Sequence, residues 1–194
     1  MDKPDLRREI RARRRAVTVH EARAAAQRLL RLALHHRLLL KARRIGFYLP
    51  MAEEIDLLPL INAALWLKRA CYLPVVPRRG TAALWFSRLT PLPRWYVNRF
   101  GIHEHASPER VRARQLDLLF LPLVAFDAQG NRLGMGGGFY DASLAYLRHR
   151  RVWRRPRLIG VAYDFQRVDR LPREPWDVPL DAVLTDRRLY RFLR

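Results

Sequence analysis

Short apolar runs of strand length alternate with segments of helical pattern along most of this 194-residue chain. A strand-length run is at most six residues here, bounded by polar or turn-forming residues. The runs are residues 44–49, 71–76, 83–87, 116–121, 158–162 and 182–185. This alternation predicts an α/β layer structure with a mainly parallel sheet. In such sheets the ligand binds beyond the carboxyl ends of the strands.

The starts of the helices are marked by capping residues. Asp2 and Pro4 predict an early helix with proline in its first turn. Thr18 and Glu21 form a capping-box pattern, which predicts a second helix that ends near residue 36. A third helix is expected over residues 57–68, after Asp56.

Length and composition indicate one domain, residues 1–194, with enough apolar side chains for a core. No apolar run approaches the roughly 18 residues of a membrane span. The basic start lacks the apolar region and cleavage site of a secretory signal. A cytoplasmic protein without membrane contact is therefore expected. The single cysteine, Cys71, excludes an internal disulfide and is expected to be a buried, inert thiol.

The chain is strongly basic, with 38 lysines and arginines against 18 acidic residues. All but three of the cations are arginine. Such a surface binds polyanions weakly at low salt and attracts ATP or the polyglutamate tail of a folate. Because no zinc finger, RNP-type aromatic motif or extended basic helix is present, no specific nucleic-acid partner is expected.

Residues 131–141 gather four glycines, a cation, two aromatic residues and a carboxylate at one strand-to-helix junction. Glycine lets the backbone approach an anion, and the helix that follows presents its positive end. Arg132 adds a charge-assisted donor, and Asp141 offers a hard oxygen to Mg²⁺. The segment lacks the Lys-Ser/Thr of a P-loop, and Phe139 stands where a dinucleotide fingerprint needs its third glycine. A phosphate site and a tight structural turn both remain open.

This segment, extended to residues 122–144, closely resembles the signature of the 5-formyltetrahydrofolate cyclo-ligases, also called methenyltetrahydrofolate synthetases. Four further blocks resemble the same family in the same order: residues 3–11, 45–56, 71–76 and 176–183. The likeness covers nearly the whole chain. It implies a single-domain three-layer sandwich of the cyclo-ligase type, with a mainly parallel central sheet, related to the sugar-phosphate isomerase and CoA-transferase folds.

The resemblance also implies the reaction. It is the ATP- and Mg²⁺-dependent cyclisation of 5-formyltetrahydrofolate, possibly polyglutamylated, to 5,10-methenyltetrahydrofolate, with release of ADP and phosphate. An N-formyl carbonyl is too stable to condense directly with the neighbouring nitrogen, so its oxygen is first phosphorylated and becomes a leaving group. Alignment and charge neutralisation then carry the catalysis. A monomer is expected.

Carried over position by position, the resemblance implies a site for each ligand. Catalysis is assigned to Arg132 and Tyr140, and the metal to Asp141 and Asp181. Folate is assigned to Glu54 for the pterin edge and to Leu49, Phe139 and Tyr140 for the ring walls. Because helix neighbours point about 100° apart, one of the two aromatic residues is expected to be structural. The nucleotide positions are Lys3, Arg7, Arg132, Leu133, Gly134, Met135, Gly136, Gly137, Gly138, Phe139 and Tyr140.

Two positions depart from the family pattern, because many relatives carry a cation at the position of Gly137 and an arginine at that of Ala142. His103 and His105 have the spacing of metal ligands, but no third ligand is evident and an ordinary loop is expected. Asp177 lies in a family-like block without an assigned role. Two rival functions stay open: a basic nucleic-acid-associated protein that has kept the fold, and a different, ATP-independent enzyme on a similar scaffold.

Overall fold

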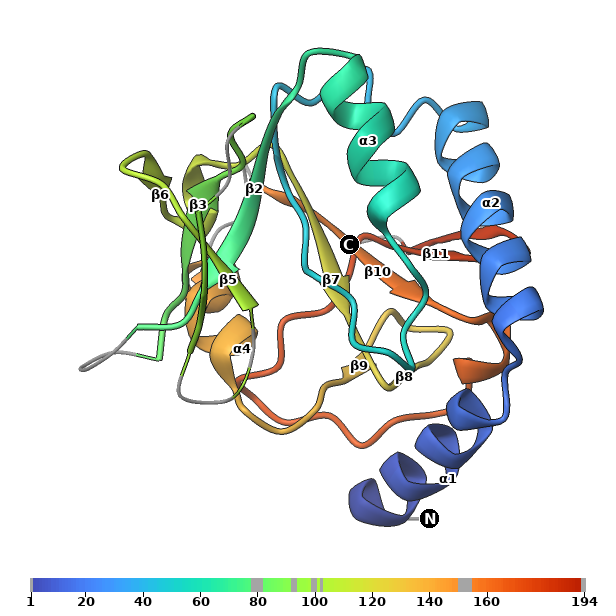
Figure 1. Ribbon diagram of the computed structural model, residues 1–194. Coiled ribbons are helices and arrows are strands. Elements are labelled where there is room, and N and C mark those ends of the chain that lie inside the picture. Colours follow the sequence, from blue (N-terminus) through green and yellow to red (C-terminus); the bar gives the residue numbers. More distant parts are fainter. Residues whose placement is uncertain are drawn as a thin grey trace.

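A mainly parallel sheet with helices on both faces forms the centre of the molecule (Figure 1). The structure is a computed structural model that describes residues 2–77, 82–91, 94–98, 101, 103–149 and 155–192. Within these residues the sheet has eight strands in the order β12-β11-β10-β7-β1-β2-β3-β6. The five strands β11, β10, β7, β1 and β2 are parallel, and β12, β3 and β6 are antiparallel additions at the two ends. The bounds are β1 Arg44–Gly46, β2 Ala70–Val75, β3 Trp85–Arg88, β6 Arg110–Val111, β7 Leu118–Pro122, β10 Arg157–Ala162, β11 Ala182–Thr185 and β12 Leu189–Arg191. The predicted α/β class is confirmed.

The three predicted helices form with the caps that the sequence indicates. Helix α1 (Lys3–Arg15) begins after Asp2, whose side chain accepts a hydrogen bond from the amide of Asp5. Helix α2 (Val19–His35) has the complete capping box of Thr18 and Glu21. Helix α3 (Leu58–Trp66) follows Asp56, whose carboxylate accepts from the Leu58 amide at 2.8 Å. None of the described helices is long and apolar enough to cross a membrane.

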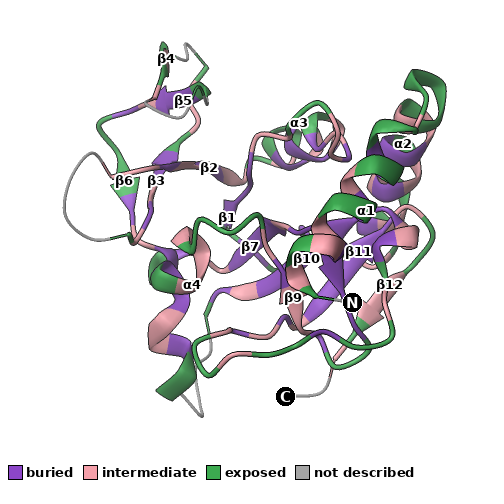
Figure 2. Cartoon of the chain, turned by 90° about the horizontal axis from the view of Figure 1, so that it is seen from below, coloured by how far each residue is buried: buried purple, intermediate pink, exposed green. Residues whose placement is uncertain are grey.

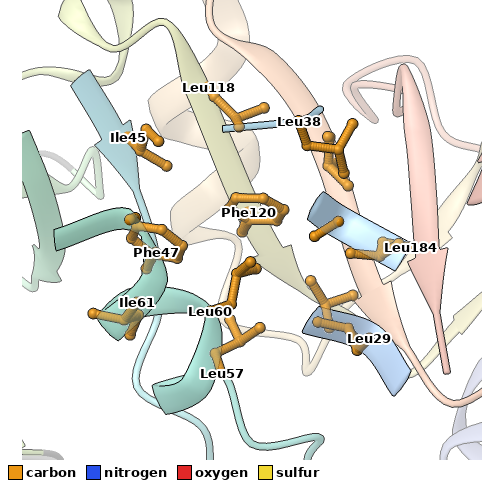
Figure 3. Packing of buried hydrophobic residues seen from close by; sticks show 14 of the residues in the cluster. Leu29, Leu38, Ile45, Phe47, Leu57, Leu60, Ile61, Leu118, Phe120 and Leu184 are labelled. Atoms are coloured by element: carbon orange, nitrogen blue, oxygen red, sulfur yellow. The ribbon is translucent and has the colours of Figure 1, made fainter. Parts of the chain in front are cut away.

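Apolar packing on both faces of the sheet gives three layers. Helices α2 and α3 cover one face, where Leu29 and Leu60 meet the stacked rings of Phe47 and Phe120, whose centroids are 5.2 Å apart (Figure 3). Helix α4 (Phe139–Leu144) and the 3₁₀ helix η2 (Ala145–His149) cover the other face. Figure 2 shows the buried central strands between these more exposed layers.

The prediction of a loop around His103 and His105 is wrong. Residues His103–Ala106 form strand β5, which pairs with β4 (Arg94–Val97) in a separate two-stranded sheet. No alternation of apolar residues marks this strand, because its buried positions include the polar Glu104 and His105. Glu104 is held by partners distant in the sequence, since it accepts from the Val76 amide at 2.8 Å. Tertiary contacts therefore determine this strand.

Candidate active site

A pocket of about 850 Å³ opens where strands β1, β2 and β7 end. It lies at the carboxyl edge of the parallel strands, where a ligand site is expected in this class of fold. Its wall combines residues of α1, the turn after β1, the glycine segment and the segment around residue 176. The predicted site residues that line it are Lys3, Arg7, Leu49, Glu54, Arg132, Leu133, Gly134, Met135, Gly136, Gly137, Gly138, Phe139, Tyr140 and Asp141.

A short hairpin carries the glycine segment to the pocket. Its strands are β8 (Ala125–Phe126) and β9 (Arg132–Leu133), and its turn is organised by the fully buried Asp127. The Asp127 carboxylate accepts hydrogen bonds from the amides of Gln129 and Asn131 and from the Asn131 side chain. It also accepts from the Leu171 amide at 3.0 Å. One buried carboxylate thus fixes the hairpin against the segment that leads to residue 176.

The glycine loop leaves open backbone at the mouth of the pocket. Gly136 and Gly138 have φ values of +107° and +65°, which other residues rarely adopt. A Cβ at either position would have no heavy atom within 4 Å, so these glycines serve the backbone conformation and not close packing. Helix α4, which follows, is only six residues long, so its dipole adds less than the sequence pattern suggests.

Arg132 lies beneath this loop as a nearly buried cation. Its side chain is 5% exposed, and Nη2 donates to Asp141 Oδ1 at 2.5 Å. Its Nε is buried and has no hydrogen-bond partner among the described residues. Because a buried cation is costly, the charge of Arg132 favours an anion in the adjoining pocket.

Helix α1 adds two cations to the same wall. The Arg7 Nε donates to the carbonyl oxygen of Gly134 at 3.0 Å, and the Lys3 ammonium is 3.2 Å from Glu174 Oε1. Lys3 and Arg7 are four residues apart and share a helix face, as the sequence predicts. Leu6 and Ile10 hold the helix through a small apolar cluster that includes Leu133 of the hairpin.

Acidic and aromatic side chains also line the pocket. Glu54 closes a tight turn in which its carboxylate accepts from the Met51 amide at 3.1 Å. Burial raises the pKa of Glu54, and burial raises the pKa of the Tyr140 hydroxyl, which therefore stays protonated. Phe139 and Tyr140 both line the pocket and both pack against the core, so their positions do not distinguish a structural aromatic residue from one at the site.

Asp181 is placed far from the other predicted site residues. It precedes β11 at the amino edge of the parallel strands, where its Oδ2 accepts from the Leu158 amide at 2.6 Å. The predicted pairing of Asp181 with Asp141 at one metal site is therefore wrong, because the two lie at opposite edges of the sheet. Asp181 links the starts of β10 and β11 instead.

Asp177 lines the pocket in place of Asp181. Its Oδ2 accepts from the Glu174 amide at 2.8 Å, which closes a turn beside the Lys3–Glu174 ion pair. Both aspartates lie in one short block, and the sequence contains a signal that separates them. Asp181 comes immediately before a strand, which places it at the amino edge of the sheet, whereas ligands bind at the carboxyl edge.

The two histidines of β5 have different environments. His103 is exposed and lines the pocket, whereas His105 is fully buried with its ring nitrogens 3.3 Å from Ser87 Oγ and 3.4 Å from Thr90 Oγ1. Among the described residues no group of three or more His, Cys, Asp or Glu side chains could hold a metal ion alone. Any metal here would need ligands from a bound phosphate or water.

Fold and site define the class of this protein as an α/β enzyme with a cation-bearing glycine loop over a pocket at the carboxyl edge of its sheet. The model of the 5-formyltetrahydrofolate cyclo-ligase family matches residues 1–186, and the chain belongs to this family.

Relatives and solved structures agree with this assignment. The 5-formyltetrahydrofolate cyclo-ligase of Escherichia coli strain K12 is 35% identical, over 94% of this chain and 100% of that protein. The enzyme of the same name from Haemophilus influenzae is 39% identical, over 92% and 95%. The structure of Aquifex aeolicus 5,10-methenyltetrahydrofolate synthetase superposes with a TM-score of 0.83 at 32% identity, covering 100% of this chain and 94% of that one.

Proposed function

We propose that this chain catalyses the ATP- and Mg²⁺-dependent cyclisation of 5-formyltetrahydrofolate to 5,10-methenyltetrahydrofolate, with release of ADP and phosphate, through phosphorylation of the formyl oxygen. The observation that carries the proposal is that one pocket is lined both by cations with open glycine backbone and by a buried carboxylate with aromatic residues. The two sets of residues match the different chemistries of a triphosphate and a pterin.

The nucleotide end consists of Lys3, Arg7, Arg132 and the backbone of residues 134–138. The charge of Arg132 and the backbone of the exposed loop residues 135–138 suit a triphosphate. In this proposal Arg132 neutralises charge on the transferred phosphoryl group, because a preorganised cation in a buried position stabilises the transition state.

Two carboxylates in the pocket fit Mg²⁺, namely Asp141 and Asp177. Mg²⁺ is usually held by one or two carboxylates together with waters and phosphate oxygens, so two carboxylates from the described residues are enough for such a site. Bound there, the ion would supply charge neutralisation for the phosphates. Asp141 also orients Arg132 through their hydrogen bond.

The folate end consists of Glu54, Leu49, Phe139 and Tyr140. The amino-pyrimidine edge of a pterin offers paired N–H donors, and a carboxylate accepts both. Leu49 and Phe139 provide apolar walls for the ring. The Tyr140 hydroxyl is a neutral donor because burial raises its pKa, and we assign it the task of orienting the reacting end of the substrate.

The assay that tests this proposal follows the near-ultraviolet absorbance of methenyltetrahydrofolate after purified protein is mixed with 5-formyltetrahydrofolate. We expect the band to grow only when both ATP and Mg²⁺ are present. If no band grows while folate and ATP stay intact, the proposal fails. Salt-dependent binding of nucleic acid by the same sample would then favour the polyanion-binding alternative.

A further inference from the structure

Arg14, in the last turn of α1, is a buried arginine outside the pocket wall. Its side chain is 1% exposed, whereas the flanking Arg15 side chain is 62% exposed. Removing a guanidinium from water is costly unless nearby negative charge compensates. A local explanation for Arg14 is therefore required.

The compensating charge comes from the acidic turn after β1. Arg14 Nη2 is 3.6 Å from Glu53 Oε2, and Arg14 Nη1 is 3.8 Å from Glu54 Oε1. Both distances are too long for good hydrogen bonds, so Arg14 acts on Glu54 mainly through charge. Its Nε is buried without a hydrogen-bond partner among the described residues. Within the part of the chain that the structure describes, this turn is therefore the strongest partner of Arg14.

The Glu54 carboxylate lies between the protein interior and the pocket. Its side chain is 7% exposed and lines the pocket, so Arg14 approaches it from behind. The groups around this carboxylate are Arg14 from α1, Glu53 in its own turn, Tyr48 after β1 and Tyr140 from α4. Burial raises the pKa of Glu54, and so does Glu53, whereas the Met51 amide and Arg14 lower it.

We propose that Arg14 is a positioning residue for the folate end of the pocket, which keeps Glu54 ionised and directed at the paired N–H donors of the pterin. The inference rests on the proposed function of Glu54 and adds a residue to which the sequence pattern gave no role. Folate recognition would then depend on the charge of Arg14, which the substrate does not touch.

The test compares Arg14→Gln with Arg15→Gln, because Arg15 approaches Glu53 at 3.8 Å but is exposed. Calorimetric binding of 5-formyltetrahydrofolate and steady-state kinetics are measured from pH 5 to 8. We expect Arg14→Gln to weaken folate binding about tenfold near neutral pH and to move the acid limb of kcat/KM for folate upward by about one pH unit, because the cation that favours the carboxylate is gone. The KM for ATP should stay within about twofold, and Arg15→Gln should show neither change.

The direction of the expected pH shift follows from the effect of Arg14, which lowers the pKa of Glu54. Without Arg14 the carboxylate takes up a proton at higher pH, so folate binding is lost earlier on acidification and returns as the pH rises. Glu53→Gln removes the like charge and should move the acid limb the opposite way. If Arg14→Gln does not fold, Arg14→Lys keeps the test decisive, because it retains the positive charge, and a rise of the acid limb by a full pH unit in this variant would contradict a role of Arg14 through charge. Arg14→Lys should restore part of the affinity.

Two results would overturn the inference. One is an unchanged folate affinity and pH profile in folded Arg14→Gln. The other is an equal loss when Arg14→Gln is added to Glu54→Gln, since a residue that acts through Glu54 should then add little. Failure of the wild-type protein to bind folate would instead count against the proposed function itself.

Discussion

The two edges of the central sheet use the same residue type for opposite purposes. At the amino edge, Asp181 accepts from the Leu158 amide and links β10 to β11. Asp117, at the start of β7, accepts from the amides of Arg43 and Arg44 and from the Arg155 side chain. At the carboxyl edge, Asp141 and Asp177 line a pocket. An aspartate before a parallel strand thus joins strands, and an aspartate beyond one is available to a ligand.

The largest expected effect comes from the carboxyl edge. Arg132→Ala and Asp141→Ala should each lower kcat by a factor on the order of 10²–10³, because each removes charge placed for the transferred phosphoryl group. Circular dichroism should still show a folded protein, although Asp141→Ala leaves the nearly buried Arg132 without its ion-pair partner and should lower the melting temperature. An active, folded Asp141→Ala enzyme would contradict the metal assignment.

A smaller loss is expected from the glycine loop. Gly138→Ala should raise the KM for ATP about tenfold, because alanine is strained by about 1–2 kcal/mol at φ +65° and the loop would shift. Gly101→Ala is a matched control, since Gly101 has φ +73°, equally open surroundings and no part in the pocket wall. Equal effects of both substitutions on ATP would show that strain alone, and not the loop, is responsible.

Substitutions at the amino edge should lower the stability of the protein and leave its turnover unchanged. Asp117→Ala removes hydrogen bonds to three residues and should lower the free energy of unfolding by about 2 kcal/mol. Urea unfolding measures the loss, and kcat of the folded fraction should remain unchanged. A fall in kcat larger than the fall in folded protein would mean that this edge contributes to the site.

The smallest expected effect is a gain in affinity for ATP. Ala142 is exposed and lines the pocket one residue after Asp141, where many relatives are expected to carry arginine. Ala142→Arg should lower the KM for ATP about threefold, since it adds one largely solvated cation near the phosphates. The gain should disappear at high salt, and a gain that persists there would indicate a direct contact.

The sequence predicts the regular parts of this fold well. Caps such as Asp2 and the pair Thr18 and Glu21 are local signals, and the structure confirms the helices that they open. Strand β11 was expected over the residues where it forms. The hairpin of β4 and β5 was not predicted, because its buried side chains include the polar Glu104 and His105, which depend on partners from other elements.

The candidate site likewise has parts that local sequence signals predict and parts that depend on distant contacts. The glycine loop, Glu54 and the two α1 cations could be predicted because their motifs are contiguous, and the structure brings them to one pocket. Their catalytic roles stay predictions. The sequence assigns the metal to Asp181 and no role to Asp177, whereas the structure places Asp177 in the pocket and Asp181 at the amino edge. The two aspartates are only four positions apart, and only the paired strands reveal which edge each one faces.

The most direct test of this account is a Mg²⁺ titration of turnover in Asp177→Asn and Asp181→Asn, followed through methenyltetrahydrofolate absorbance. We expect Asp177→Asn to need at least about tenfold more Mg²⁺ for half-maximal rate, because it loses one of the two proposed carboxylates. Asp181→Asn should keep the wild-type requirement and lose only stability, by about 1–2 kcal/mol. The reverse pattern, with a normal requirement in Asp177→Asn and a raised one in Asp181→Asn, would contradict the placement of the active site at the carboxyl edge.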